Sequence, residues 1–283
     1  MVKLNILITG SDGFLGSNLF NSLKTKYNVF EGNRKTINLL SKENIENFIV
    51  QNNINAVLHC AIQGGNRLCE DDIEIVYNNL LISENLLYFT DKYELFINFA
   101  SGAEFDRSMN IENAPESLLY QRIPKDYYGL SKNIISKRMS ETYPICNFRL
   151  FGCFNHNEKD SRFIKSGIIK TKKKEPIIIH QDKYMDFIYF NDVVSTVTNY
   201  LDDCEHKNFY MFHDMNLCYE KKYKLSDIAN IINSFSLYKS EIIIENKDPG
   251  LNYTGDSTNF MKTFPKLKGL ELGIKECYDK IIL

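Results

Sequence analysis

No apolar run in this 283-residue sequence approaches the roughly 20 residues that a helix needs to cross a bilayer. The opening segment Met1–Asn5 leads directly into a short apolar stretch and then into glycines. It lacks the long apolar region and the small-residue cleavage site of a signal peptide. We therefore expect a cytoplasmic protein with no membrane partner.

Other signals are also missing. The formal net charge is only −2, which gives no reason to expect a nucleic acid as partner. The seven cysteines form no CxxC pair, and the five histidines show no HxH or HxxxH spacing. We expect neither a disulfide framework nor a metal site. With 43% hydrophobic and 25% charged residues, the composition is that of an ordinary globular protein.

Short apolar runs alternate with helical patterns in the first half of the chain. The predicted strands span residues 4–9, 27–31, 56–59, 94–100 and 145–150, and the predicted helices 14–26, 42–51, 71–92 and 127–141. Strands that alternate with helices form a parallel sheet with right-handed crossovers and helices on both faces. The predicted fold class is therefore α/β, with a Rossmann-type doubly wound parallel sheet.

The rhythm changes after residue 150, where we expect a smaller C-terminal α/β substrate lobe. Helices are expected near 161–171, 191–202 and 225–234, and strands near 176–180, 185–189, 208–213 and 241–245. The tail is rich in Lys, Gly and Tyr. The predicted boundaries are 1–152 for the dinucleotide-binding domain, with 186–204 returning to it, and 153–185 with 205–283 for the substrate-binding lobe.

Gly10, Gly13 and Gly16 follow the first predicted strand and open the first predicted helix, in a GxxGxxG pattern. In such turns one glycine permits the tight bend, one lets the backbone approach a pyrophosphate, and one lets helix and strand pack closely. The helix N-terminus offers free N–H groups and the positive end of its dipole to the phosphates. The strand–turn–helix context favours a dinucleotide site over a merely structural turn.

The end of the second strand usually distinguishes NAD from NADP, since an acidic residue there binds the ribose hydroxyls and an arginine favours a 2′-phosphate. Glu31 lies about 20 residues after the turn and could serve NAD. Arg34 and Lys35 lie where a 2′-phosphate would need cations. Asp12 in the turn counts slightly against the added phosphate. We favour NADP(H) over NAD(H).

Tyr128 and Lys132 form a YxxxK pair, and positions i and i+4 of a helix face the same way. An ammonium beside a phenol favours the phenolate, so the tyrosine can act as the acid in reducing a ketone or as the base in oxidising an alcohol. Ser101 ends the fourth predicted strand, where ligands of open α/β sheets bind. Its hydroxyl can hydrogen-bond a substrate oxygen, and the alternative role for it is a helix or turn cap.

Together these residues resemble the extended short-chain dehydrogenase/reductases, the NAD-dependent epimerase/dehydratase group, over essentially the whole chain. His59-Cys60-Ala61 is similar to the H-x-A motif of the family, and Arg149–Gly152 to its R-x-x-N motif. Tyr77–Leu80 resembles the long-helix motif whose second Asn, here Asn79, supports the active site. Asp186–Val193 resembles the late D-F-I-x-V-D-D-V motif.

The resemblance implies sets of site residues and no metal. The implied catalytic residues are Ser101, Tyr128 and Lys132. The implied cofactor-binding residues are Gly10, Asp12, Gly13, Phe14, Leu15, Gly16, Arg34, Leu39, Cys60, Ala61, Ile62, Asn79, Ala100, Tyr128 and Lys132. The implied substrate-binding residues are Gly65, Asn66, Arg67, Ala103, Arg162 and Lys183.

Within the family, the loop Ala61–Gly65 and the segment Arg34–Leu40 resemble GDP-fucose synthase-like nucleotide-sugar 4-ketoreductases. The GDP-fucose enzymes also epimerise, with a Cys two residues after the catalytic Ser and a His in the following lobe. Those positions here are Ala103 and Arg162, neither of which readily abstracts a proton from carbon. Glu104 alone does not make the Asp-Glu pair of the dehydratases.

Two positions depart from the family pattern. Gly152 stands in place of an Asn, and Met185 in place of an Arg that often contacts the diphosphate of the substrate. A diphosphate needs a cation, for which Lys183, Arg162 and Arg67 are the candidates.

The predicted function is NADPH-dependent reduction of a 4-keto nucleotide-diphosphate sugar, without epimerase activity, in deoxysugar synthesis for a surface polysaccharide. Two alternatives stay open. An NAD-dependent nucleotide-sugar C4-epimerase would use the same three catalytic residues. A non-catalytic dinucleotide-binding protein would share the fold.

The resemblance also implies a homodimer, because the helices near 71–92 and 127–142 commonly pair across an interface in this family. Their apolar residues could equally belong to the core. These residues are Ile73, Val76, Leu80, Leu87, Ile134, Ile135 and Met139.

Overall fold

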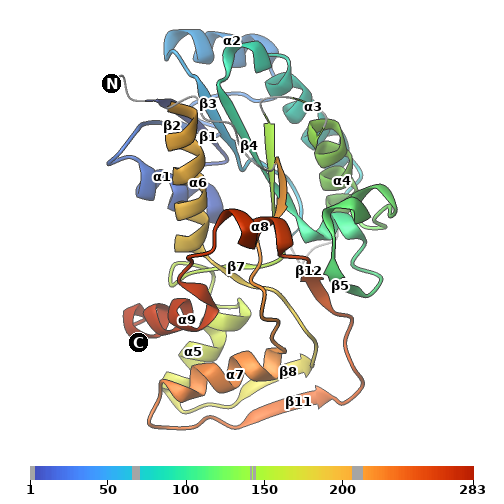
Figure 1. Cartoon of the computed structure of the whole chain (residues 1–283), viewed down its shortest axis with the longest axis vertical. Helices are drawn as coiled ribbons and strands as arrows, with labels where there is room; N and C mark the ends of the chain where they lie inside the picture. Colours follow the sequence, from blue (N-terminus) through green and yellow to red (C-terminus); the bar gives the residue numbers. More distant parts are fainter. Residues whose placement is uncertain (1–3, 66–70, 141, 143–144, 206–212) are drawn as a thin grey trace. The chain divides into compact units, whose positions relative to one another are not determined.

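The computed structural model describes residues 4–65, 71–140, 142, 145–205 and 213–283 (Figure 1). The chain divides into two compact units. Unit 1 consists of Met1–Asp106, Ser117–Arg149 and Thr196–Met215, and unit 2 of Arg107–Glu116, Leu150–Ser195 and Asn216–Leu283. In the described part of the chain, no helix has the length and hydropathy of a membrane span.

A six-stranded sheet forms the centre of unit 1, in the order β10-β6-β4-β3-β1-β2. Its strands in chain order are β1 (Asn5–Thr9), β2 (Asn28–Gly32), β3 (Ala56–His59), β4 (Leu95–Ser101), β6 (Ile145–Leu150) and β10 (Asp214–Asn216). β1 pairs in parallel with β2 and β3, and β3 pairs in parallel with β4. Near-continuous apolar runs suit such strands, because helices bury both of their faces. The expected doubly wound α/β fold class is confirmed.

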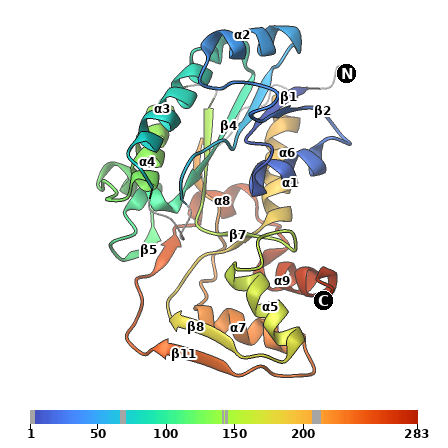
Figure 2. The ribbon, with the colours of Figure 1, turned by 180° about the vertical axis from the view of Figure 1, so that it is seen from behind.

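Helices cover the sheet on its two faces (Figures 1 and 2). On one face, α3 (Glu74–Leu87) packs between α2 (Lys42–Gln51) and α4 (Tyr127–Ser140). On the other face lie α1 (Phe14–Leu23) and α6 (Phe190–Glu205).

The core of unit 1 lies between the sheet and α2–α4. Strand residues such as Leu7, Val57 and Phe96 meet Ile45 of α2 and Met139 of α4 there. The apolar helix residues that could be core or interface separate into two sets. Leu87, Ile135 and Met139 are buried in this core and Leu80 packs against it, whereas Ile73 and Ile134 are exposed.

Some predicted elements are shorter than expected. The helix predicted over 71–92 begins at Glu74, whose amide donates a hydrogen bond to the Asp72 carboxylate at 2.9 Å. It ends at Leu87 and is followed by the 3₁₀ helix η1 (Thr90–Lys92). The strand predicted near 208–213 lies almost wholly outside the described residues, and β10 begins at Asp214.

Unit 2 contains three short parallel strand pairs. The pairs are β8 (Ile177–Gln181) with β11 (Ile242–Asn246), β5 (Ile111–Ala114) with β12 (Tyr253–Gly255), and β7 (Cys153–Phe154) with β9 (Ile188–Tyr189). The helices are α5 (Phe163–Lys173), α7 (Leu225–Ser234), α8 (Thr258–Thr263) and α9 (Gly269–Lys280). Figure 2 shows α5 and α7 beside the β8–β11 pair.

The tail of the chain, for which the sequence predicted no element, forms β12, α8 and α9. The start of α9 is held by a residue that is far away in the sequence. Asp192 accepts hydrogen bonds from the backbone N–H groups of Lys268 and Gly269 at 2.9 and 3.0 Å, and from the Tyr219 hydroxyl. The Asp of the late family motif thus caps a helix that begins more than 70 residues later.

Candidate active site

The turn between β1 and α1 offers a cradle for phosphates. A Cβ on Gly16 would lie 2.4 Å from the carbonyl oxygen of Gly10, so only glycine permits this close approach. α1 starts after Gly13 with no capping side chain from the described residues. The buried hydroxyl of Ser11 likewise has no hydrogen-bond partner among them. Uncapped N–H groups and a free hydroxyl fit the pyrophosphate of a dinucleotide.

The segment after β2 forms a compact turn that exposes two cations. Thr36 Oγ1 donates to the carbonyl oxygen of Glu31 at 2.6 Å, and Asn33 Oδ1 accepts from the Lys35 amide at 2.9 Å. The side chains of Arg34 and Lys35 lie at the exposed tip of this turn. Both predicted cations therefore lie at the carboxyl end of β2.

The remaining predicted cofactor residues follow neighbouring strands. Asp12, Phe14 and Leu15 follow β1, Leu39 follows β2, Cys60, Ala61 and Ile62 follow β3, and Ala100 lies near the end of β4. The amides of Cys60 and Ala61 both donate to Thr9 Oγ1 at 3.1 Å, which joins the loop after β3 to the end of β1. Carboxyl ends of adjacent parallel strands are where ligands of open α/β sheets bind.

A buried hydrogen-bonded chain runs from Thr9 to α3. Because Thr9 Oγ1 already accepts two backbone bonds, its proton points to His59 Nδ1 at 2.9 Å. The proton of the neutral imidazole is therefore on Nε2, which faces Ser83 Oγ at 3.5 Å. Ser83 donates in turn to the carbonyl oxygen of Asn79 at 2.9 Å. Burial, aided by the charge of Lys132, lowers the pKa of His59 to about 3 and keeps it neutral.

Asn79 fastens the loop after β3 to α4. Its Oδ1 accepts from the Gln63 amide at 2.8 Å, and its Nδ2 donates to the Gln63 carbonyl oxygen at 3.0 Å. The same Nδ2 donates to Ser131 Oγ at 3.1 Å, and Ser131 donates to the carbonyl oxygen of Tyr128 at 2.9 Å. The side chain predicted to support the active site thus positions both the loop and the helix that carries Tyr128.

The loop after β3 lies directly on the Tyr128 ring. Gly65 has a φ of +76°, and a Cβ built on it would lie 2.9 Å from ring carbons Cδ2 and Cε2 of Tyr128. The Asp71 carboxylate accepts from the Gly65 amide at 3.0 Å and holds this conformation. The neighbouring substrate candidates Asn66 and Arg67 lie outside the described residues.

Lys132 is buried one turn after Tyr128. Its Nζ donates to the carbonyl oxygen of Phe99 in β4 at 2.6 Å. Burial lowers the pKa of Lys132 to about 8, although Glu104 acts in the opposite direction. The ammonium is therefore close to its titration point at neutral to mildly basic pH.

Ser101 ends β4 and also caps the 3₁₀ helix η2 (Gly102–Phe105). Its Oγ accepts from the Ala103 amide at 3.2 Å, and its own amide donates to Glu104 Oε1 at 2.8 Å. The cap occupies a lone pair of the hydroxyl and leaves the proton available to a substrate oxygen. Capping and substrate binding, which the sequence posed as alternatives, are therefore compatible.

η2 packs tightly against α4. A Cβ on Gly129 would lie 2.7 Å from the carbonyl oxygen of Ala103, so these two backbones are in direct contact. Ala103 is buried and carries no acid–base group. This contact brings Ser101, two residues earlier, onto the same framework as Tyr128.

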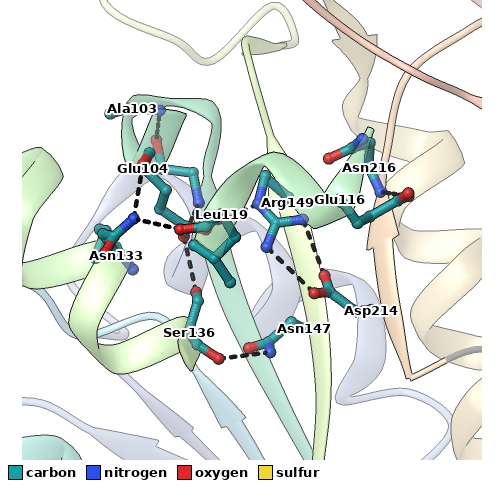
Figure 3. Close-up of polar contacts among 12 residues, drawn as sticks. Ala103, Glu104, Glu116, Leu119, Asn133, Ser136, Asn147, Arg149, Asp214 and Asn216 are labelled. Carbon is teal, nitrogen blue, oxygen red and sulfur yellow. Dashed lines mark hydrogen bonds and ion pairs between the residues drawn. The ribbon is translucent and has the colours of Figure 1, made fainter. Parts of the chain in front are cut away.

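Glu104 is fully buried and points into a polar cluster between α4 and β6 (Figure 3). Its Oε1 accepts from Ser136 Oγ at 2.8 Å, and its Oε2 accepts from Arg149 Nε at 2.8 Å. Arg149 Nη1 donates to Asp214 at 2.9 Å. Burial raises the pKa of Glu104, while Arg149 acts in the opposite direction. Both carboxylate oxygens are thus engaged by protein groups.

The remaining substrate candidates, Arg162 and Lys183, belong to unit 2. Arg162 precedes α5, is 43% exposed, and lies 3.7 Å from the carboxylate of buried Glu158. Beside the position of Met185, Asp186 forms an ion pair of 2.8 Å with Lys222. No pattern in the sequence indicated Lys222, because its partner lies 36 residues away.

The described residues contain no group of three or more His, Cys, Asp and Glu side chains that could hold a metal ion. Tyr128 and Lys132 on α4 and Ser101 at the end of β4 all belong to unit 1, as does the turn between β1 and α1.

We predict that Gly65→Ala lowers kcat by roughly tenfold to a hundredfold, because the new methyl group displaces the Tyr128 ring from its working position. The Kd of the dinucleotide, measured by fluorescence titration, should change little. Gly269→Ala is the matched control, since Gly269 has a similar φ of +83° but open space around its Cβ. Equal kcat in Gly65→Ala and the parent protein would contradict this packing role.

The NAD dependent epimerase/dehydratase family matches residues 6–217 of the chain. No curated protein matches its sequence. Among solved structures, it is similar to the GDP-mannoheptose C4 reductase from Campylobacter jejuni with NADP bound. That match has a TM-score of 0.78 at 15% identity over 99% of this chain and 98% of that one.

Two further solved structures have the same fold. One is the UDP-glucose 4-epimerase from Thermotoga maritima with UDP-glucose, with a TM-score of 0.76 at 17% identity over 98% of both chains. The other is a GDP-L-fucose synthetase from Naegleria fowleri, with a TM-score of 0.77 at 14% identity over 99% of this chain and 93% of that one. The family match covers well over half of the sequence, and the chain therefore belongs to the NAD dependent epimerase/dehydratase family.

Proposed function

We propose that the protein reduces the ketone of a 4-keto nucleotide-diphosphate sugar with NADPH and does not epimerise it. The proposal is supported by the Tyr128–Lys132 spacing on α4, which packs against η2 directly after Ser101, and by the absence of a free acid–base side chain at positions 103 and 104. Ala103 has no ionisable group, and the oxygens of Glu104 are engaged by Ser101, Ser136 and Arg149. Reduction needs one proton donor at the carbonyl, whereas epimerisation beside it also needs groups that remove and return a carbon-bound proton.

Each residue then has a separate task. NADPH supplies the hydride when it is bound. Tyr128 donates a proton to the developing alkoxide, and the Lys132 ammonium lowers the pKa of the phenol. Ser101 orients the carbonyl through its free hydroxyl proton.

The residues after β1 and β2 fit NADPH. The uncapped start of α1 and the hydroxyl of Ser11 suit the pyrophosphate. Arg34 and Lys35 at the exposed turn suit a 2′-phosphate. The reductase from Campylobacter jejuni that shares the fold has NADP bound, which agrees with this preference.

The proposal also covers substrate recognition, the oligomeric state and the cellular role of the enzyme. The nucleotide-diphosphate sugar would be recognised by cations, with Arg162 and Lys183 as the described candidates. The exposed side chains of Ile73, directly before α3, of Tyr77 on α3 and of Ile134 on α4 support a homodimer through these helices. A cytoplasmic enzyme of deoxysugar synthesis for a surface polysaccharide fits these features.

The function is tested by titrating the purified protein with NADPH and NADH and then adding 4-keto sugars linked to GDP, CDP, dTDP and UDP. We expect NADPH oxidation with one of them and a product that retains its C5 configuration. Tyr128→Phe should abolish turnover and leave NADPH binding intact. Tightly bound NAD with interconversion of C4 epimers and no net NADPH oxidation would establish an epimerase instead. Unchanged turnover in Tyr128→Phe would refute the assigned acid.

Cofactor preference has its own test. Removing a charge-assisted bond to the 2′-phosphate in Arg34→Ala should raise the KM for NADPH by roughly tenfold to a hundredfold. The KM for NADH, which lacks that phosphate, should stay within about twofold of the parent value by the same argument. Lys24→Ala, on the exposed end of α1, is the matched control for loss of a surface cation. Equal losses with both cofactors would exclude 2′-phosphate recognition by Arg34.

Reduction should slow as pH rises through about 8, because Lys132 loses its proton there and no longer favours the tyrosinate. Glu104, Cys60 and His59 interact electrostatically with Lys132, and Tyr128 precedes it by one helical turn; His59 stays neutral at these pH values. The measurement is the pH profile of kcat/KM. The arginine of Lys132→Arg keeps its charge up to a pH of about 12, so the fall in kcat/KM should move to higher pH in this variant. If kcat/KM falls at the same pH in the parent protein and in Lys132→Arg, a group other than Lys132 is responsible for the fall.

A further inference from the structure

We propose that Glu104 is a positioning residue for the active site, which holds Ser101 against the helix that carries Tyr128 and Lys132. The proposal rests on the function proposed above and assigns a task to a side chain outside the catalytic set. Figure 3 shows Glu104 at the meeting point of η2, α4 and β6.

The first contact is with the catalytic serine itself. Glu104 Oε1 accepts a hydrogen bond from the Ser101 amide at 2.8 Å, while Ser101 Oγ accepts from the Ala103 amide at 3.2 Å. The two bonds form a reciprocal capping box around η2. They determine the backbone direction at Ser101 and thereby the direction of its hydroxyl.

The second set of contacts is with α4. The same Oε1 accepts from Ser136 Oγ at 2.8 Å, one helical turn after Lys132. The backbone carbonyl oxygen of Glu104 accepts from Asn133 Nδ2 at 2.9 Å. Glu104 therefore joins the end of β4 to the catalytic helix through both its side chain and its main chain.

The third contact gives the carboxylate a charged partner and holds it in place. Arg149 Nε donates to Glu104 Oε2 at 2.8 Å, and both side chains are completely buried. Arg149 is itself fixed by Asp214, at 2.9 Å, and lies over the Phe105 ring. A buried carboxylate needs such a partner, since an unpaired charge is strongly destabilising.

A stability role alone would not require this arrangement. Apolar residues of similar volume replace buried ion pairs without loss of stability in other proteins. What apolar residues cannot supply is the acceptor for the Ser101 amide. If Glu104 positions Ser101, the carboxylate oxygen that accepts from the Ser101 amide must matter for activity, whereas the charge of Glu104 need not.

The test compares two double variants, Glu104→Gln with Arg149→Met and Glu104→Leu with Arg149→Met. Both remove the ion pair, and Asp214 can reach water because its side chain is 22% exposed. Only the glutamine keeps an oxygen for the Ser101 amide and Ser136. We expect kcat close to the parent value in the glutamine variant and lower by roughly tenfold to a hundredfold in the leucine variant. The KM for NADPH should be the same in both. Equal kcat in the two folded variants overturns the proposal.

Two further measurements keep the result decisive. Amide hydrogen exchange over residues 99–106, without substrate, should be faster in the leucine variant than in the glutamine variant. This exchange experiment tests whether Glu104 holds Ser101 in place even if the parent protein reduces no 4-keto sugar. That second result would refute the proposed function and leave the positioning role standing.

If neither double variant folds, Ser136→Ala leaves the Glu104–Arg149 pair intact and should lower kcat severalfold at constant KM for NADPH. Unchanged kcat in Ser136→Ala would then overturn the proposal.

Discussion

The buried Glu104 carboxylate, which is paired with the Arg149 guanidinium, accepts the hydrogen bonds on which the arrangement of the candidate active site depends. Both groups are completely buried, so each must keep its partner to avoid an unpaired charge in the core. The carboxylate also binds the Ser101 amide and Ser136 on α4. The end of β4, the short helix η2 and α4 are therefore held as one framework, which β6 completes.

A second set of polar contacts holds α4 from the side of α3. The Asn79 amide binds both backbone groups of Gln63 and the Ser131 hydroxyl, and Ser131 reaches the backbone of Tyr128. His59, kept neutral by burial, links this group to the turn that cradles phosphates. In the proposed reaction, preorganisation of this kind would orient Tyr128 toward the carbonyl, and orientation accounts for a large share of enzymatic rate enhancement.

Much of unit 1 could be predicted from the sequence because its strands are apolar and its helices periodic. α2, β3, β6 and α7 have the predicted bounds. The short pairs β5–β12 and β7–β9 could not be predicted, because strands of two to four residues carry too little pattern and depend on a distant partner. The role proposed for Glu104 was hidden for the same reason, since its side-chain partners on α4 and β6 lie 32 and 45 residues away. The glycine turn and the YxxxK pair could be recognised in the sequence, because the residues of each motif are only a few positions apart.

The resulting account has one proton donor at the carbonyl and no residue placed to remove a proton from the neighbouring carbons. The most direct test is to run the reduction in D₂O with NADPH and to determine by mass spectrometry where deuterium enters the sugar. The account predicts no deuterium at C3 or C5 beyond that of an enzyme-free control. Enzyme-dependent deuterium at either carbon would contradict it, because a second acid–base group would then have to act on the substrate.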